Sequence, residues 1–306
     1  SEQVKLPLVF KKIKPDLVHF PHFNVPIFYG GSYVVTVHDL IHQRFQMRRS
    51  TTRDPLTYKI KQFGYNLAFK AALRKSKKIL VPSNFVKNQL MNEWSQSSGK
   101  ILVTYEGVDE KLLQLIQKIS AGDAKKIVSS LNIKTPFIFY VGNAHPHKNV
   151  EGLIKAFGGL KRQFPNLSLV LSGHDHYFWQ RIVKEFPAQK VIYTGYISDE
   201  QMIALYKTAE VFVMPSFEEG FGIPVLEAMA AGCSVVSSDR GSLPEVGGNA
   251  SLYFDPSSLE DMNTKISQVL SKPQLRKELI DKGKIRYKEF SWERLAKQTL
   301  NVYNLV

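Results

Sequence analysis

Two glutamates eight residues apart, Glu219 and Glu227, are the side chains best suited to hold a polar ligand. They lie in the stretch 215–232, PSFEEGFGIPVLEAMAAG, which follows a short apolar run typical of a buried strand. Pro224 suits the start of a helix and Gly232 the residue just past its end, so a loop and then a helix are expected. Glu219 then lies in the loop and Glu227 about one turn into the helix. Two carboxylates placed in this way can accept hydrogen bonds from hydroxyls on two different parts of one ligand.

The same loop has the features of a phosphate site. Gly220 and Gly222 let the backbone approach a ligand closely, and the N–H groups of a helix start have no partner within the helix. Glu218 is not part of the pattern, because the residue eight positions after it is Leu226. The alternative is a strand, loop and helix whose acids lie at the surface and whose small residues serve only for packing.

Two further side chains with suitable chemistry follow predicted strands. His38 comes directly after a β-branched run and precedes Asp39. In open α/β sheets ligands bind beyond the carboxyl ends of strands, which places His38 for function, although a structural pairing with Asp39 would also explain it. Lys148 lies between an apolar run, 137–142, and a helix expected from Val150. There it can bind phosphate as a point charge, the alternative being a solvated loop lysine.

These motifs together resemble a known enzyme family. The frame G-F-G-x-P-x-x-E-A-M-A-x-G around the two glutamates, with T-V-H-D-L at 36–40 and Y-E-G-V-D at 105–109, resembles the retaining glycosyltransferases of family 4. Such enzymes have the GT-B fold, an α/β architecture of two Rossmann-like domains that face a cleft. The resemblance extends from about residue 14 to the end of the chain.

The resemblance implies three parts. Residues 1–120 would form an N-terminal, acceptor-side Rossmann-like domain, 121–290 a C-terminal nucleotide-sugar-binding Rossmann-like domain, and 291–306 a crossover helix that returns to the N-terminal domain. The crossover helix is expected to pack with one face formed by Trp292, Leu295, Leu300 and Tyr303. The N-terminal domain is expected to lack its first strands, since 1–120 holds about four strands where six or seven are usual, a difference of roughly 60–90 residues.

The resemblance also implies roles for single residues. Glu219 would hold the hydroxyls of the transferred sugar, Lys148 would neutralise the leaving diphosphate, and His38 would steer the acceptor or the sugar. Asn143 stands where the family commonly has arginine, so either the diphosphate is held by one cation fewer or another base supplies the charge. The donor-binding residues would be Glu227, on the ribose, with Tyr196, beside the base, and Gly142, Asn143, Gly220, Phe221, Gly222 and Ile223.

The implied function is retaining transfer of a hexose from a nucleotide sugar to a lipid-linked or polysaccharide acceptor. The motif P-H-K-N at 146–149 points toward mannose and a GDP-mannose donor. No protein nucleophile is evident, which favours a front-face displacement. Two alternatives are a nucleotide-sugar-binding fragment without turnover and an enzyme of the same fold with another reaction, such as a sugar-nucleotide epimerase or a phosphorylase.

Neither a cofactor nor a metal ion is expected, because cationic side chains can neutralise the diphosphate. His174, Asp175 and His176 are adjacent in a loop, and adjacent residues rarely converge on one ion without further ligands. The single cysteine, Cys233, excludes an internal disulfide and is expected to be a small buried residue.

The charge of the chain predicts a polyanionic partner. The chain of 306 residues carries a net charge of +14, and 1–120 alone holds 19 Lys and Arg against 8 Asp and Glu. A basic loop, 44–53, and a basic helix with aromatic residues, 55–74, suit an anionic membrane surface. Nucleic acid is disfavoured, since zinc-knuckle spacing and RNP-like motifs are absent. With no apolar run of membrane-spanning length and no signal-peptide pattern, the prediction is a cytoplasmic protein, peripheral on the inner face of the membrane.

Overall fold

A computed structural model describes the chain except residues 1, 42–54, 95–98, 175–176 and 187–189. The chain divides into two compact units: unit 1 comprises Ser1–Glu106 with Glu293–Val306, and unit 2 comprises Gly107–Trp292. The first boundary lies earlier than residue 120, because the helices α5 (Glu110–Lys118) and α6 (Ala121–Ser130) pack against α9 (Asp199–Thr208) of unit 2. Lys207 on α9 donates to two carbonyl groups near the end of α5, those of Ile116 and Ile119, each at 2.6 Å.

Unit 1 contains a parallel sheet with the strand order β1-β2-β3-β4. Its central strands are short runs rich in β-branched residues, YVVT and KILV, and these are almost wholly buried. Aromatic side chains from the first helix and strands, among them Phe10, Phe20 and Tyr33, pack into its core. The described elements are β1 (Val18–Phe20), β2 (Tyr33–Thr36), β3 (Lys78–Val81), β4 (Ile101–Val103), α1 (Glu2–Ile13), α3 (Pro55–Lys75) and α4 (Asn84–Glu93).

The last helix, α14 (Trp292–Tyr303), packs against this sheet with a face that differs from the predicted one. Val302 lies against Val34 and Leu80, and Tyr303 bonds through its hydroxyl to Nδ1 of His19 at 2.5 Å. The prediction that Leu300 belongs to this face is wrong, because its side chain is 58% exposed. Leu300 and Val302 are two residues apart and therefore project from nearly opposite sides of a helix with 3.6 residues per turn.

The other residue that was expected on this face and does not belong to it is Trp292, which is also exposed. Thr299 is buried in this face instead, although its side chain carries a polar hydroxyl. The packed positions of α14 therefore follow the helical period from Val302, and the leucine and tryptophan that suggested the other face lie on solvent.

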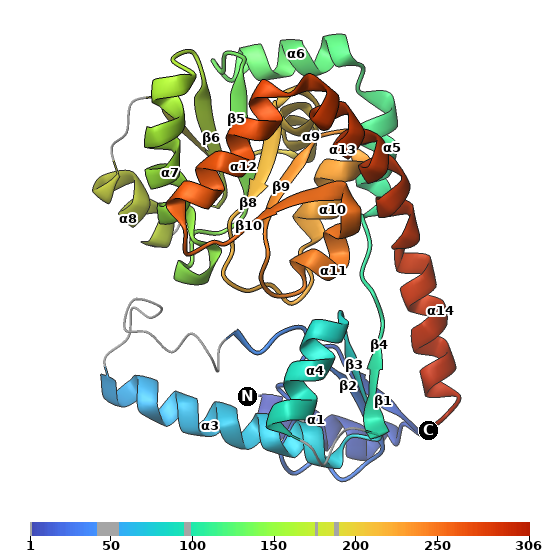
Figure 1. The fold of residues 1–306 in the computed structure, drawn as a ribbon. Helices are drawn as coiled ribbons and strands as arrows, with labels where there is room; N and C mark the ends of the chain where they lie inside the picture. Colours follow the sequence, from blue (N-terminus) through green and yellow to red (C-terminus); the bar gives the residue numbers. More distant parts are fainter. Residues whose placement is uncertain (1, 42–54, 95–98, 175–176, 187–189) are drawn as a thin grey trace. The chain divides into compact units, whose positions relative to one another are not determined.

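Unit 2 contains a six-stranded parallel sheet with the order β10-β9-β8-β5-β6-β7. Its helices include two packed pairs, α7 with α12 and α6 with α9 (Figure 1). The remaining elements are β5 (Phe137–Val141), α7 (Val150–Gln163), β6 (Ser168–Ser172), α8 (Tyr177–Glu185), β7 (Val191–Gly195), β8 (Val211–Met214), α10 (Ile223–Ala230), β9 (Val235–Ser238), α11 (Leu243–Gly247), β10 (Ser251–Phe254), α12 (Leu259–Ser271) and α13 (Pro273–Arg286).

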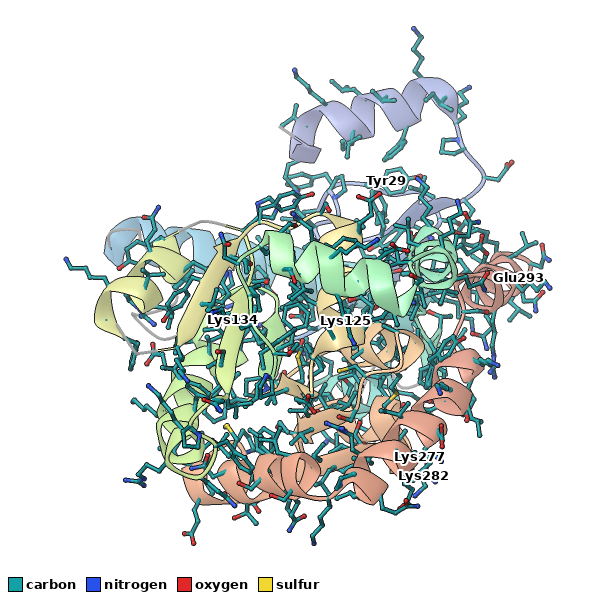
Figure 2. All side chains as sticks on the ribbon, turned by 90° about the horizontal axis from the view of Figure 1, so that it is seen from above. Tyr29, Lys125, Lys134, Lys277, Lys282 and Glu293 are labelled. Carbon is teal, nitrogen blue, oxygen red and sulfur yellow. The ribbon has the colours of Figure 1, made fainter. Side chains whose placement is uncertain are left out.

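The strand order of unit 2 reverses at its centre. β5 pairs with β6 on one side and with β8 on the other. The chain therefore continues from β5 to β6 on one side of the sheet and returns to the other side of β5 with β8. Such a switch point leaves a crevice at the carboxyl ends of the two strands, because their connections run to opposite sides. Lys125 on α6 and Lys277 on α13 are exposed on the surface of the unit (Figure 2).

Candidate functional site

The switch point brings two loops of unit 2 together. One follows β5 and contains the short helix η3 (Pro146–Lys148), and the other follows β8 and runs from residue 215 to 222. The N–H of Phe217 donates to the carbonyl of His147 at 2.7 Å, which ties the loops together directly. Asn149, buried and with a φ of 55°, donates from its side chain to the carbonyls of Pro215 and Pro256. The backbone of both loops is therefore held in place.

Lys148 and Glu219 form a buried ion pair in this crevice. The Nζ atom of Lys148 lies 2.7 Å from each carboxylate oxygen of Glu219. Ser216 donates its hydroxyl to Oε1 of the same carboxylate, also at 2.7 Å. Glu219 is 6% exposed, and the side chain of Lys148 is 15% exposed. A pair so far from water depends on each partner, because removal of one leaves the other as an uncompensated buried charge.

The backbone of Glu219 is fixed from the opposite side by the turn before α11. The hydroxyl of Ser242 donates to the carbonyl of Glu219 at 3.0 Å and to that of Phe221 at 2.8 Å. Gly241, with a φ of +66°, approaches so closely that a Cβ atom there would lie 2.8 Å from the backbone nitrogen of Glu219. The main chain of Glu219 is therefore fixed, and its carboxylate is oriented by Ser216 and Lys148.

The helix that follows this loop begins and ends where the sequence predicts. Gly222 is its N-cap with a φ of +101°, Pro224 lies in its first turn, and Gly232 follows its end with a φ of +77°. A left-handed φ at both ends is readily adopted only by glycine. The predicted residue Phe221 is buried, with its ring packed edge-on against Phe290 at 5.7 Å between centroids, so this ring is not exposed to a ligand.

Glu227 lies one turn into α10 and also has a protein partner. Its Oε2 atom accepts a hydrogen bond from the hydroxyl of Tyr206 on α9 at 3.1 Å. Burial raises the pKa of the Glu227 carboxyl from 4.5 to about 7, although the bond from Tyr206 opposes the shift. Glu219 and Glu227 therefore each have a hydrogen-bond partner within unit 2.

The raised pKa of Glu227 predicts a pH-dependent stability. Between pH 4.5 and about 7 the folded chain holds a proton on Glu227 that the unfolded chain has lost. The free energy of unfolding should therefore fall as pH rises through this window, by on the order of 1–3 kcal/mol relative to Glu227→Gln. Denaturant unfolding of both proteins at pH 5 and pH 8 measures the difference, with Glu260→Gln, which removes an exposed carboxylate of the same unit, as control. Parallel pH dependences of wild type and Glu227→Gln would contradict the assignment.

Two of the remaining predicted donor-binding residues lie at the end of β5. Gly142 has a φ of +152° and donates its N–H to the carbonyl of Ser172 at 3.0 Å. Asn143 accepts the hydroxyl hydrogen of Tyr140 on its carbonyl and the N–H of His145 on its side chain. Asn143 thus shapes the turn that leads to Lys148, and it brings no cation.

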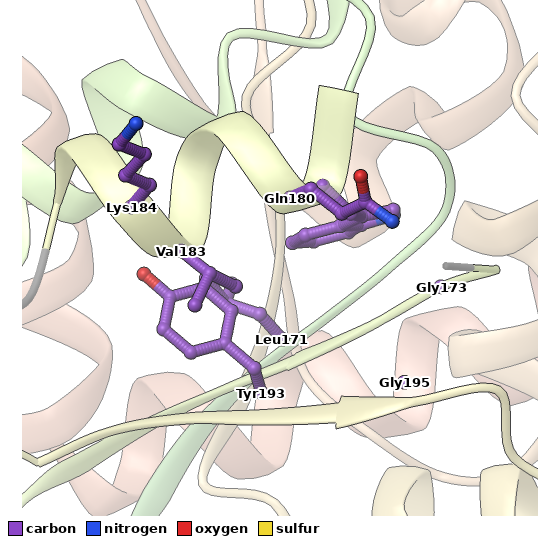
Figure 3. A pocket seen from close by; sticks show the side chains of 8 residues that line it. Leu171, Gly173, Gln180, Val183, Lys184, Tyr193 and Gly195 are labelled. Atoms are coloured by element: carbon purple, nitrogen blue, oxygen red, sulfur yellow. The ribbon is translucent and has the colours of Figure 1, made fainter. Parts of the chain in front are cut away.

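Tyr196 lies beyond the end of β7, apart from the ion pair. It is exposed, and its ring lies 4.7 Å from that of His174, measured between centroids. A pocket of about 440 Å³ opens beside Gly173 and Gly195, between α8 and the sheet, where Val183 points toward the ring of Tyr193 (Figure 3). None of the predicted site residues is among those that line this mainly apolar pocket.

His38 belongs to unit 1 and lies just after β2. Its Nε2 atom donates to the carbonyl of Pro21 at 3.0 Å, and its Nδ1 atom lies 3.1 Å from the carboxylate of Glu106. Because both acceptors lack hydrogens, the ring is best satisfied when both nitrogens are protonated, and the bond to Glu106 raises the pKa of His38. Asp39 instead accepts the N–H of Ile41 at 2.9 Å, so it is not the partner that the sequence suggested.

The predicted site residues thus fall into groups. The structure brings Lys148, Glu219 and the loop 220–223 together in unit 2, with Glu227 one turn further along α10. Tyr196 lies at a separate strand end and His38 in the other unit. Sequence reasoning missed the partners Ser216, Tyr206 and Glu106. Ser216 could have been noticed three residues before Glu219, whereas no local signal marks the other two.

Other predictions concern metal ions and membranes. Among the described residues no group of three or more His, Cys, Asp or Glu could hold a metal ion, and Asp175 and His176 lie outside the described residues. The basic loop 44–53 also lies outside them. Within the described ranges, every helix is too short or too polar to cross a bilayer. Cys233 is buried, as predicted, and burial raises the pKa of its thiol to about 12.

The sequence matches two family descriptions that together cover most of the chain. Residues 123–286 match Glycosyl transferases group 1, and residues 2–112 match Glycosyltransferase Family 4. The O-antigen chain mannosyltransferase B of Escherichia coli is 30% identical over 302 residues, which cover 96% of this chain and 75% of that protein. The MMP alpha-(1->4)-mannosyltransferase of Mycolicibacterium hassiacum is 27% identical over 283 residues, or 90% of this chain and 65% of that protein.

Solved structures share the architecture. Anabaena Alr3699/HepE in complex with UDP-glucose superposes with a TM-score of 0.81 at 17% identity, over 99% of this chain and 82% of its own. Sucrose-phosphate synthase from Thermosynechococcus elongatus superposes with a TM-score of 0.75 at 24% identity, over 98% of this chain and 76% of its own. These neighbours confirm the GT-B fold that the sequence predicts.

Proposed function

The chain belongs to the group 1 glycosyltransferases, and we propose that within this family it transfers mannose from GDP-mannose, with retention of configuration, to a glycan or lipid-linked acceptor. Transfer of a hexose follows from the family, and the choice of mannose is supported by relatives named as mannosyltransferases. The observation that carries the proposal is the buried pair of Lys148 and Glu219 at the switch point of unit 2. It places a cation suited to a diphosphate beside a carboxylate suited to sugar hydroxyls.

Each residue of the site then has a role that its chemistry permits. Glu219 accepts hydrogen bonds from hydroxyls of the transferred sugar, and Glu227 accepts those of the ribose. Lys148 and the backbone amides near Gly222, at the start of α10, neutralise the charge that develops on the leaving diphosphate. Electrostatic stabilisation of this kind usually contributes more to the rate enhancement than any other single effect. No metal ion is needed in this scheme, since these groups carry the positive charge.

We infer a front-face displacement for the chemical step. The bond from the anomeric carbon to the diphosphate oxygen breaks, that oxygen takes the proton of the acceptor hydroxyl, and the acceptor oxygen bonds to the same face of the sugar. Proton and electron pair both end on the diphosphate, so no protein nucleophile takes part. Lys148 stabilises the departing oxygen. The role proposed for His38, whose pKa is raised by its bond to Glu106, is to steer the sugar or the acceptor.

The acceptor side is proposed to work at an anionic membrane surface, on the cytoplasmic face. The support is the excess of basic residues in the first 120 residues and the surface of α1. Leu8 and Ile13 are exposed on this helix together with Lys11 and Lys12, an arrangement suited to anionic headgroups. The aromatic residues of α3 differ from one another, since Phe69 is buried in the core of unit 1 and Phe63 is 71% exposed.

The proposal predicts selective binding of one nucleotide. Calorimetric titrations with GDP, UDP and ADP, and with their hexose conjugates, should show that GDP and GDP-mannose bind most tightly. Chelator in every titration should leave the affinities unchanged, since no metal ion is needed. Glu227→Ala should weaken binding roughly 10- to 100-fold, because the ribose hydroxyls lose a hydrogen-bond acceptor.

Two outcomes would overturn parts of this proposal. Tighter binding of UDP-glucose than of GDP-mannose would contradict GDP-mannose as the donor but not the position of the site. If the protein bound none of the nucleotides, the proposed site as a whole would be wrong. Glu260→Gln serves as the folded reference in these titrations. Release of mannose epimers without an acceptor would instead favour the epimerase alternative.

A further inference from the structure

The single ammonium group of Lys148 has two possible acceptors, the carboxylate of Glu219 and the diphosphate of the donor. In the structure that group donates to both carboxylate oxygens of Glu219, whereas the proposed function requires it on the diphosphate of the donor. An ammonium that is shared with a buried carboxylate has lost much of its attraction for a phosphate, because the neighbouring negative charge opposes it. Binding of the donor must therefore draw Lys148 away from Glu219, at least in part.

Lys148 is the partner that is able to move. The carbonyl and the backbone nitrogen of Glu219 are enclosed by Ser242 and Gly241, so its side chain has a fixed origin, and the hydroxyl of Ser216 holds its carboxylate. The backbone of Lys148 is also held, through the bond between Phe217 and His147. Its side chain, however, has four rotatable carbon–carbon bonds and can swing its Nζ atom without moving the loop.

The departure of Lys148 would leave Glu219 poorly satisfied. Oε1 would retain the hydroxyl of Ser216, but among the residues that the structure describes Oε2 has no hydrogen-bond donor other than Lys148. A carboxylate that is 6% exposed cannot recover the loss from bulk water. New donors have to come from the ligand, and sugar hydroxyls are such donors.

We propose that Lys148 exchanges partners in each catalytic cycle, and that Glu219 thereby makes the site distinguish the nucleotide sugar from the nucleoside diphosphate that remains after transfer. With a sugar present, its hydroxyls satisfy Glu219 and Lys148 is free for the diphosphate. With a bare diphosphate, Lys148 can serve the phosphate only by leaving Glu219 unsatisfied. The inference rests on the proposed function and adds to it a role for Glu219 in specificity.

The exchange has a consequence for the order of events. Transfer removes the sugar from the diphosphate, and when the glycosylated product leaves, Glu219 loses its hydroxyl donors. Lys148 then returns to Glu219, and the diphosphate loses its cation. The same two residues that hold the donor therefore promote release of the diphosphate.

A first test uses the unaltered protein and two separate ligands. Free mannose should occupy Glu219 and release Lys148, so saturating mannose should tighten the binding of GDP about 3- to 30-fold, with the reciprocal effect of GDP on mannose. Mannitol at the same concentration serves as the control for a general solute effect. Independent or mutually exclusive binding of mannose and GDP would overturn the exchange.

A second test compares ligands across variants. The wild type should bind GDP-mannose about 10- to 100-fold more tightly than GDP. In Glu219→Gln the neutral side chain no longer competes for Lys148, so the affinity for GDP should rise while that for GDP-mannose falls, and the ratio should approach one. Glu260→Gln removes the same charge from the surface of unit 2 and should leave the ratio unchanged.

The outcomes separate the exchange from the proposed function. Loss of GDP-mannose binding in Glu219→Gln without any gain for GDP would show that Glu219 binds sugar but does not compete for Lys148, which overturns the exchange alone. Failure of the wild type to bind any nucleotide would overturn the proposed function first. If Glu219→Gln does not fold, the test with free mannose still decides, because it needs no variant.

Discussion

Replacing Lys148 by methionine should lower kcat by about 100- to 1,000-fold, with a smaller effect on KM. Methionine keeps much of the volume and flexibility of the side chain but removes the charge that faces the leaving diphosphate. That charge matters most in the transition state, where the bond to the diphosphate is breaking, and it acts in a crevice where the side chain is only 15% exposed. The measurement is steady-state kinetics with GDP-mannose and an acceptor extract, after the fold of the variant is verified by circular dichroism.

The control for this prediction is a lysine of the same unit without a place in the site. Lys125→Met removes an exposed charge from α6 and should leave kcat within about twofold (Figure 2). A rise in KM alone for Lys148→Met would mean that the lysine binds the ground state and the transition state equally. An unchanged kcat would remove Lys148 from the reaction altogether.

The second large effect concerns stability. Lys148→Met and Glu219→Gln should each lower the free energy of unfolding by about 3–5 kcal/mol, because each leaves one buried group without its counter-charge. The double variant leaves no uncompensated charge and should lose clearly less than the two singles together, by about 1–3 kcal/mol. Denaturant unfolding of the four proteins completes the cycle.

A surface pair provides the reference for that cycle. Lys282 and Glu278 lie one turn apart on α13, and both side chains are substantially exposed. Their coupling should not exceed about 0.5 kcal/mol, because solvent screens the pair. If the buried and the exposed pair gave similar coupling energies, Lys148 and Glu219 would contribute to binding only and not to the folded state.

The candidate site shows where sequence reasoning is strong. Glu219 and Glu227 lie in a loop and a helix as predicted, because Pro224, Gly222 and Gly232 decide the bounds of α10 locally. The prediction for Lys148 rests on equally local evidence, namely a strand followed by a turn and a helix start. Such signals depend on a few neighbouring residues, and long-range packing does not alter them.

The same reasoning was weaker wherever a side chain depends on a distant partner. Four residues of α14 suggested a buried face, but Leu300 among them is exposed and Thr299 lies in the interface. The sequence of one helix contains several apolar stripes, and only the surface of the sheet that receives it selects among them. His38 likewise received Glu106 as its partner, 68 residues away, rather than the adjacent Asp39.

The sequence by itself therefore determines the family, the two α/β halves and the local setting of each candidate residue. What only the tertiary structure decides is that Lys148 and Glu219, 71 residues apart, meet as a buried pair. Their meeting requires β5 and β8 to be neighbours in the sheet, and strand order is settled by burial of the whole unit rather than by any local pattern. The degree to which the charge of Lys148 is available to a ligand therefore depends on the fold, because only the fold places Glu219 beside it.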